Sequence, residues 1–352
     1  MNKFRIGLIG LGGMAKEHIR WMKAENVYEF VAVSDVNGDA MARVGDQLGI
    51  EDGKRYANYK GLIEDPDVDA VVSVTPNNVH ADIMSACLHA GKPFLAEKPF
   101  TRIFEEAVPL LELYEKHPVP VMIGFTYRYT PAFRYAREIV RSGKLGTVRH
   151  FSHQYLQGFG VPHQQVPYMW RYNKAVTGTG ALGDLGSHMI DMARFLFGEF
   201  EELTAQLQTI VPERRDPVTG AMAKIEVDDF ASFQARMTGD VMGVFQTSRN
   251  AFGSGNQHEV TIYGDLGTVH AGTLDPDHIV WIREEEGGQL ARALVEVPAH
   301  CKVTQYADFA AVLRGTPADG VPGFMDGYRN QEVLDAVVRA SESKSAVRLR
   351  AD

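Results

Sequence analysis

The first 125 residues alternate short apolar runs with segments of helical periodicity. The runs that predict buried strands are residues 4–9, 30–34, 70–74, 94–96 and 119–124. Helices are predicted between them, up to about residue 24 and at residues 40–48, 80–90 and 105–115. Continuous apolar strands that alternate with helices are typical of a parallel sheet covered on both faces. The pattern therefore predicts a doubly wound α/β domain over residues 1–125.

The pattern changes after about residue 126, where strand candidates follow one another with turn signals between them. From residue 147 the chain alternates apolar with polar positions, and further strand candidates are residues 203–211, 227–237, 241–248, 259–263 and 279–282. Helices are predicted at residues 131–142, 184–197, 304–314 and 325–343. Such a succession predicts an α+β domain over residues 126–352, with a large open, mostly antiparallel sheet. We expect the helix at 325–343 to pack back near the first domain.

Charge and cysteine content narrow the partners and the compartment. The 352 residues carry 36 Lys and Arg against 45 Asp and Glu, a formal net charge of −9, without a basic cluster. Binding to nucleic acid or to an anionic membrane surface needs clustered cations, so neither partner is expected. No apolar run approaches the roughly 18 residues that span a bilayer. The two cysteines, Cys87 and Cys301, match neither a zinc pattern nor a disulfide framework, which favours a reducing, cytoplasmic compartment.

A glycine-rich segment follows the first predicted strand. Residues 6–15 superficially resemble a signal peptide, but their glycines make a poor apolar core, and we expect them to belong to the mature fold. Gly10, Gly12 and Ala15 instead fit the pattern G-x-G-x-x-A between a strand and a helix. The first glycine permits a tight turn, the second lets a pyrophosphate approach the backbone, and the helix N-terminus binds the phosphates. The segment therefore predicts a dinucleotide site.

An acidic residue at the end of the second predicted strand favours NAD as the dinucleotide. A carboxylate at Asp35 would accept hydrogen bonds from the ribose hydroxyls and repel the 2′-phosphate of NADP. Neither Lys nor Arg follows among Val36, Asn37 and Gly38 to bind such a phosphate. The alternative interpretation is that Asp35 serves only the turn.

Two loops follow the third and fourth predicted strands, at the sheet edge where ligands of open α/β sheets bind. The first carries Thr75, Pro76 and Asn77, and the second carries Glu97 and Lys98. Lys98 is expected where the substrate and the nicotinamide meet. The alternative interpretation is a surface lysine paired with Glu97.

Three polar residues share one face of the helix predicted at residues 184–197. Asp184 lies four residues before His188, and Asp191 lies three residues after it. An acid one turn before a histidine can orient its ring and raise its basicity, as a general base for a hydroxyl proton requires. Two alternatives stay open: a metal bound by the three residues, and a helix N-cap at Asp184 followed by a core histidine.

The segment between residues 150 and 173 is rich in His, Gln and aromatic residues, among them Tyr155, His163 and Trp170. Aromatic rings stack on the apolar faces of sugars, while amides and imidazoles bind hydroxyls, so this composition suits a polyol pocket. A strand and loop of ordinary polar exposure is the alternative.

These motifs together resemble the Gfo/Idh/MocA family, which includes glucose–fructose oxidoreductase, inositol dehydrogenase and a rhizopine catabolism protein. The matching segments lie in the family's order over almost the whole chain. They are residues 10–15, 75–77 with His80, 90–93, 97–99, Gly124 and Phe125 with Arg128 and Tyr129, Trp170 with Arg171, 180–191, and the closing tail 327–349. Thr179 stands where many members have a glycine, a departure that leaves the expected chemistry unchanged.

The resemblance implies a Rossmann domain, a second domain with an open sheet, and a homodimer or homotetramer built through that sheet. It implies that Lys98, Asp184 and His188 are catalytic. No metal is expected, because no further ligand cluster accompanies Asp184, His188 and Asp191 in the sequence. The cofactor-binding residues it implies are Gly10, Gly12, Gly13, Met14, Asp35, Thr75, Pro76, Asn77, His80, Glu97, Lys98, Arg128, Trp170 and Arg171. The substrate-binding residues it implies are Lys98, Arg128, Tyr155, His163, Trp170, Asp184 and His188.

The expected activity is oxidation of a secondary hydroxyl of a sugar, anhydrosugar or cyclitol to a ketone, with NAD as cofactor. Two alternatives remain. One is an enzyme with tightly bound NAD that catalyses a net non-redox reaction, such as oxidation-assisted glycoside cleavage or epimerisation. The other is an NAD-binding regulator without turnover, which would have no need of Lys98, Asp184 and His188 together.

Overall fold

The computed structural model describes residues 3–285 and 287–349, which divide into two compact units. The first unit comprises Met1–Phe125 and Thr304–Gln331, and the second comprises Thr126–Val303 and Glu332–Asp352. The division predicted from the sequence differs from these units in residues 304–331. That segment is distant in sequence from the first domain but groups with it through long-range contacts. It includes the start of the helix at 325–343, which the sequence predicts to pack back near the first domain.

The first unit contains a parallel sheet, as the sequence predicts. In the described part of the chain the sheet has six strands in the order β3-β2-β1-β4-β5-β6. The strands are β1 (Phe4–Ile9), β2 (Tyr28–Ser34), β3 (Arg55–Tyr56), β4 (Ala70–Ser73), β5 (Phe94–Ala96) and β6 (Val121–Ile123). All neighbouring pairs are parallel. The order reverses between β1 and β4, which puts the ends of these two strands at the switch point where dinucleotides bind in such sheets.

Helices connect the strands of the first unit. They are α1 (Gly13–Ala24), α2 (Gly38–Leu48), α3 (Tyr59–Glu64), α4 (His80–His89) and α5 (Phe104–Lys116). Helix α9 (Gln305–Leu313) belongs to the returning segment 304–331. The sequence pattern missed β3 and α3, because two and six residues are too short to show a period. Residues of the returning segment complete the core: the Tyr28 hydroxyl donates to the Tyr306 carbonyl oxygen (2.5 Å), and Phe324 stacks on Tyr114.

The second unit contains a large, mostly antiparallel sheet. Within the described residues nine strands follow the order β16-β15-β14-β13-β7-β12-β11-β8-β17. They are β7 (Val148–Leu156), β8 (Phe200–Gln208), β11 (Phe230–Met237), β12 (Val241–Ser248), β13 (Gln257–Gly264), β14 (Gly267–Gly272), β15 (His278–Glu284), β16 (Leu290–Glu296) and β17 (Val347–Arg348). The pair β7 and β12 is parallel, and the other pairs are antiparallel. The ends of β7 and β12 therefore lie at the same edge of the sheet.

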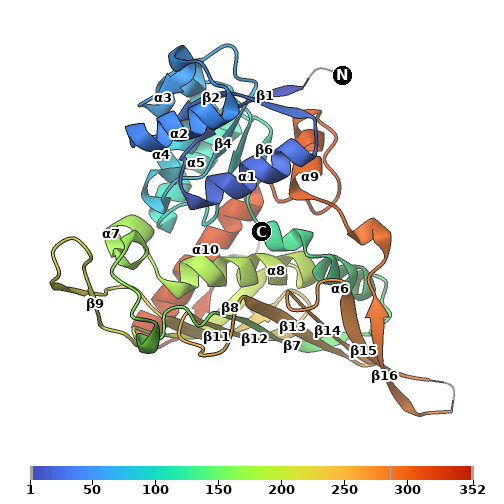
Figure 1. Ribbon diagram of the computed structural model, residues 1–352. Coiled ribbons are helices and arrows are strands. Elements are labelled where there is room, and N and C mark those ends of the chain that lie inside the picture. The colour runs from blue at the N-terminus through green and yellow to red at the C-terminus, as the bar shows by residue number, and fades with distance from the viewer. Residues whose placement is uncertain (1–2, 286, 350–352) are drawn as a thin grey trace. The chain divides into compact units, whose positions relative to one another are not determined.

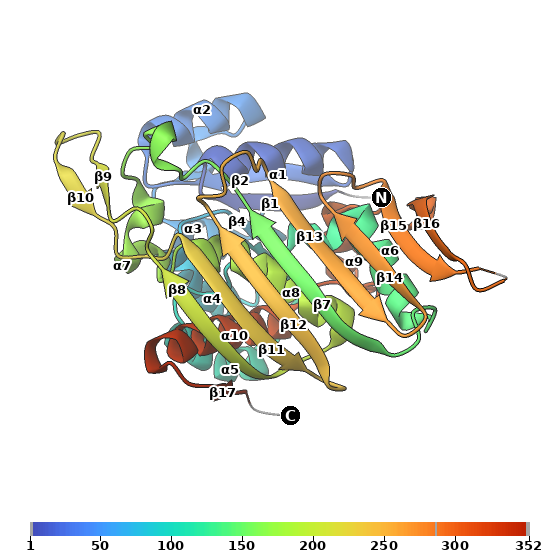
Figure 2. The ribbon, with the colours of Figure 1, turned by 90° about the horizontal axis from the view of Figure 1, so that it is seen from below.

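Helices of the second unit cover one face of this sheet. They are α6 (Pro131–Arg141), α8 (Ser187–Phe197) and the later part of α10 (Phe324–Ser343). The short helix α7 (Lys174–Thr177) instead follows the turn at Trp170–Tyr172. Figure 1 shows α6 and α8 on the same side of the sheet, and Figure 2 shows the strands in front of them. The opposite face carries exposed apolar side chains such as Met242 (44% exposed) and Val244 (51%) among polar ones.

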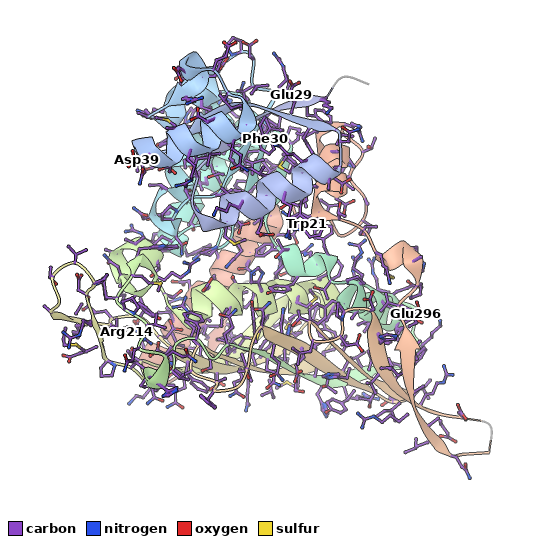
Figure 3. All side chains as sticks on the ribbon, viewed as in Figure 1. Trp21, Glu29, Phe30, Asp39, Arg214 and Glu296 are labelled. Atoms are coloured by element: carbon purple, nitrogen blue, oxygen red, sulfur yellow. The ribbon has the colours of Figure 1, made fainter. Side chains whose placement is uncertain are left out.

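A short hairpin of β9 (Glu213–Arg215) and β10 (Met222–Lys224) extends from the second unit, with Arg214 in its first strand (Figure 3). The sequence pattern did not predict this hairpin, nor β14 and β16. Leu290, Ala291 and Arg292 in β16 are good helix formers. Pairing with β15 overrides that preference.

No helix in the described ranges is both long and apolar enough to cross a membrane.

Candidate active site

The glycine turn after β1 has the geometry of a phosphate-binding loop. Gly10 has a φ of +85°, and a Cβ at this position would lie 2.4 Å from the Val74 carbonyl oxygen, so only glycine fits. A Cβ at Gly12 or Gly13 would meet nothing within 4 Å. Protein packing therefore does not require these two glycines. They border open space at the N-terminus of α1, which begins without a side-chain cap and fits the pyrophosphate of a dinucleotide.

The Asp35 carboxylate is fixed beside this turn. Its Oδ2 accepts a hydrogen bond from the Leu11 backbone N–H (2.6 Å), and its Oδ1 accepts one from the Asn37 N–H (2.8 Å). These bonds support the turn, as the alternative interpretation proposed. A carboxylate has further acceptor capacity, so these bonds leave Asp35 able to accept more hydrogen bonds, and binding of ribose hydroxyls stays a prediction.

Side chains of the first unit tie its two strand-end loops together. The ring nitrogens of buried His80 lie 2.9 Å from the Thr75 carbonyl oxygen and 2.8 Å from the Pro99 carbonyl oxygen. His80 therefore links the loop after β4 to the loop that carries Lys98. These contacts support the two loops, and the cofactor contact that the family resemblance implies for His80 stays a prediction.

Glu97 anchors the backbone at Lys98. The Glu97 side chain is buried, pairs with His18 (2.9 Å) and accepts a hydrogen bond from the Lys98 backbone N–H (3.2 Å). Burial raises the pKa of Glu97, but the hydrogen bond from His18 and nearby positive charges outweigh burial and hold the pKa below its ordinary value. Glu97 is therefore a buried anion that supports the loop.

In the second unit, Asp184 lies on a π-helical turn. The predicted helix at 184–197 begins instead as a π-helix, Leu182–Gly186, and continues as α8. Asp228 explains the departure: its buried carboxylate accepts hydrogen bonds from the Gly180 N–H (2.6 Å) and the Leu182 N–H (2.7 Å). Burial raises the pKa of Asp228 despite these bonds. Short π-helical turns inside helices are frequent at functional sites.

Asp191, the third polar residue of the predicted constellation, serves another purpose. Arg128 donates to both of its oxygens, at 2.8 Å and 2.6 Å, and both side chains are almost fully buried. Because this pair occupies the carboxylate, the structure gives no support to a metal bound by Asp184, His188 and Asp191. The Arg128 guanidinium is held inside the second unit, and a direct role in binding cofactor or substrate stays a prediction.

The His188 ring packs against a hydrogen-bonded aromatic cluster. Tyr127 meets His188 edge to face, with ring centroids 4.6 Å apart. The Tyr127 and Tyr155 hydroxyls are 2.6 Å apart, Tyr155 donates to Asn256 Oδ1 (2.6 Å), and Asn256 Nδ2 donates to the Tyr127 hydroxyl (2.7 Å). Gln157 donates to the same Asn256 oxygen (2.8 Å). The cluster holds Tyr127 against His188 and groups hydroxyl and amide groups beside the ring.

Beneath this cluster lie two buried histidines. His153 Nε2 and His258 Nε2 are 2.9 Å apart, and the Tyr127 and Tyr155 rings contact His258 at centroid distances of 4.8 Å. Burial lowers the pKa of His153 to about 3 and the pKa of His258 well below its ordinary value. Both rings are therefore neutral at physiological pH, one donating and the other accepting.

Two sequence profiles match the chain and decide its family. Residues 4–125 match a profile described as an oxidoreductase family with an NAD-binding Rossmann fold, and residues 133–270 match the Gfo/Idh/MocA C-terminal domain. The chain belongs to the Gfo/Idh/MocA family of oxidoreductases. It is an NAD-dependent oxidoreductase, and the open space at Gly12 and Gly13 with the fixed Asp35 suits this cofactor.

Several members of the Gfo/Idh/MocA family are similar over nearly the whole chain. Levoglucosan dehydrogenase of Pseudarthrobacter phenanthrenivorans is 29% identical, covering 99% of this chain and 98% of that protein. Myo-inositol 2-dehydrogenase of Thermotoga maritima is 29% identical over 82% of this chain and 81% of its own. A solved structure of levoglucosan dehydrogenase in complex with NADH and L-sorbose matches with a TM-score of 0.92 at 28% identity, over 100% of both chains.

The remaining predicted residues are placed as follows. Met14 is half-exposed on the first turn of α1, Pro76 is exposed, and Asn77 is buried. In the second unit His163 is exposed in a short turn, and the Arg171 guanidinium lies over the Trp170 ring, 4.6 Å from its centroid. These placements do not test the roles that the family resemblance implies.

No individual role was predicted from the sequence for four residues near Asp184 and His188: Tyr127, Asp228, Arg249 and Asn256. Three of them lie just before or after strands at one sheet edge, where β7 and β12 end and β11 and β13 begin. The sequence offers one signal for these three residues: each is a polar residue just outside one of these strands. The strand pairing needed to gather them is not visible in the sequence.

Proposed function

We propose that this enzyme oxidises a secondary hydroxyl of a sugar, anhydrosugar or cyclitol to a ketone. The observation that carries the proposal is the placement of Asp184 and His188 one turn apart on a distorted helix. The His188 ring packs there against Tyr127, whose hydroxyl accepts a hydrogen bond from the Asn256 amide. Such a site suits proton transfer from a polyol hydroxyl. The names of the similar proteins, levoglucosan dehydrogenase and myo-inositol 2-dehydrogenase, support the same substrate class.

In this proposal His188 takes the hydroxyl proton, and Asp184 orients His188 and accepts a hydrogen bond from a substrate hydroxyl. Lys98, held by the Glu97 and His80 contacts of the first unit, stabilises the developing negative charge on the substrate oxygen. NAD supplies the hydride acceptor when bound. The chain's own residues thus provide the base, its orientation and the electrostatic stabilisation.

The substrate pocket and the assembly are further parts of the proposal. Tyr155 contributes its hydroxyl to the polar cluster beside His188, while Arg128, His163 and Trp170 stay predicted contacts. A homodimer or homotetramer would form through the open face of the large sheet, where Met242 and Val244 are exposed. Burying these side chains between copies would stabilise the assembly.

The test is a panel of inositols, aldoses and anhydrosugars incubated with NAD⁺ and the purified protein. The near-ultraviolet absorbance of NADH should rise with at least one polyol. Turnover of a glycoside or epimerisation of a sugar without net NADH would instead identify the non-redox alternative. Binding of NADH without turnover of any panel member would identify the regulator and overturn the proposal.

A further inference from the structure

Arg249 is a buried cation in direct contact with Asp184. Its side chain is 2% exposed, whereas that of Asp184 is 27% exposed. One terminal nitrogen, Nη2, donates to Asp184 Oδ2 (2.9 Å) and to the Gly180 carbonyl oxygen (3.1 Å). The same guanidinium nitrogen therefore holds the carboxylate and the backbone of the turn that carries it.

The backbone of Arg249 is fixed independently of this contact. Its N–H donates to the Asp229 carbonyl oxygen (2.9 Å), and its carbonyl oxygen accepts from the Gly160 N–H (2.8 Å). A Cβ at position 160 would lie 2.7 Å from that carbonyl oxygen, so the close approach requires glycine. Arg249, directly after β12, is thus anchored to the residue before β11 and to the loop that carries Gly160, and its guanidinium can act as a fixed support.

Among the described residues around the Arg249 guanidinium, Asp184 is the carboxylate that pairs with its charge. Its Nε and Nη1 atoms are buried and have no hydrogen-bond partner within the described residues. The rings of Phe159 and Tyr172 lie 6.0 Å from it. A buried cation is costly unless it is paired, and Asp184 is the carboxylate to which Arg249 donates. Asp228 lies close enough for the charge of Arg249 to lower its pKa, although burial dominates there.

We propose that Arg249 is a positioning residue that holds the Asp184 carboxylate in place as an anion. The inference rests on the proposed function, in which Asp184 orients His188 and binds a substrate hydroxyl. A carboxylate held by a guanidinium is a hydrogen-bond acceptor, so the proton removed from the substrate goes to His188. The residue acts through Asp184 and touches neither the reacting atoms nor the cofactor.

The first experiment measures steady-state kinetics of Arg249→Met with NAD⁺ and the polyol identified by the panel. Loss of the fixed Asp184 geometry should lower kcat by about 100-fold, with the KM for NAD⁺ and the Kd for NADH unchanged. Arg249→Lys, which keeps the charge, should recover part of kcat. Ethylguanidinium added to Arg249→Ala should also restore part of it, whereas sodium chloride at equal ionic strength should not.

Arg214→Met is the matched control. Arg214 is also buried, donates to the Val166 and Gly160 carbonyl oxygens, and lies over the same Tyr172 ring, 4.5 Å from its centroid. Its hydrogen bonds in the described structure go to carbonyl oxygens instead of a carboxylate. If Arg249 merely stabilised this region, both variants would lower the melting temperature and kcat alike, and that outcome would overturn the proposal.

A double-mutant cycle with Asp184→Asn separates the two proposals. If Arg249 acts through Asp184, Arg249→Met should change kcat less than threefold in the Asp184→Asn background. Additive effects would overturn the positioning role and leave the proposed function standing. If the wild-type enzyme oxidises no polyol, the proposed function fails. The same double-mutant cycle, measured by thermal unfolding, then tests the Arg249–Asp184 contact alone. A coupling energy between the two substitutions that is indistinguishable from zero would overturn the positioning role.

Discussion

The glycine turn at Gly10 in the first unit and the turn that carries Asp184 in the second, the proposed cofactor and acid–base sites, are held in place by different means. Near Gly10, neighbouring backbone groups and the carboxylate of Asp35, at the end of the adjacent strand, fix the geometry. Near Asp184, the geometry depends on side chains from distant strands: Asp228 binds the turn's N–H groups and Arg249 binds its carbonyl and carboxylate.

The difference follows from what each ligand demands. A pyrophosphate is bound by backbone N–H groups and a helix N-terminus, which a short glycine motif supplies by itself. A histidine base needs a carboxylate held at a set position beside it. A carboxylate in a largely buried turn itself needs hydrogen-bond or charged partners. We therefore expect substitutions at the first turn to change cofactor affinity, and substitutions or protonation in the second unit to change turnover or stability.

The largest expected effect is at Lys98, the residue of the first unit to which the proposed mechanism gives a chemical role. Lys98→Met should lower kcat by about 1000-fold, because it removes the charge that stabilises the developing oxyanion. NADH affinity, measured by fluorescence titration, should stay unchanged. Lys60→Met, at an exposed lysine of α3, is the control and should turn over normally. Normal turnover of the Lys98 variant would remove it from the mechanism.

The next largest effect is a loss of stability of the second unit in mild acid. His153 and His258 are neutral in the fold because burial lowers their pKa values, to about 3 for His153. The unfolded chain binds protons at both residues below about pH 6.5, so the free energy of unfolding should fall by about 2 kcal/mol between about pH 6.5 and 5.5. Urea unfolding at the two pH values measures this loss.

Two glutamine variants sharpen that measurement. His153→Gln keeps a hydrogen-bond donor for His258 and removes one titrating group, so it should lose only about half as much stability over the same pH interval. His163→Gln, at an exposed histidine, should behave as the wild type. A pH dependence in His153→Gln equal to that of the wild type would show that the buried pair is not its source.

A smaller effect is expected at Asp35. Asp35→Asn should raise the Kd for NADH about tenfold, since charged hydrogen bonds to the ribose are lost. The Kd for NADPH should change less, because a repulsive charge disappears as well. Asp39→Asn, at an exposed residue of α2 (Figure 3), is the control and should bind both cofactors as the wild type does. An equal loss for both cofactors would restrict Asp35 to supporting the turn.

The smallest effect separates two glycines of the same turn. Gly12→Ala meets no protein atom within 4 Å and should leave the melting temperature unchanged, while weakening NADH binding a few-fold by crowding the pyrophosphate. Gly10→Ala should instead lower the melting temperature, because its Cβ would contact the Val74 carbonyl oxygen at a positive φ. Equal stability of the two variants would contradict the geometry of the turn.

Much of the fold could be predicted from local patterns. Strands β1, β5 and β12 have the predicted bounds, and α1 ends at the predicted residue. Strands such as β16 and the hairpin β9–β10 could not, because pairing with a neighbour outweighs their own weak preferences. In the candidate site, the spacing of four residues between Asp184 and His188 predicted that both lie on one helix face. The π-helical turn beneath them depends on Asp228, more than forty residues later in the chain.

The sequence by itself determined the family, the NAD-binding turn and the identity of the proposed acid–base residues, because short motifs and periodicity carry that information locally. Only the tertiary structure decided which charges meet. It assigns Asp191 to Arg128, places Arg249 on Asp184 and buries His153 against His258. Each of these contacts joins residues far apart in the chain, and strand pairing and burial, which bring them together, are properties of the whole fold.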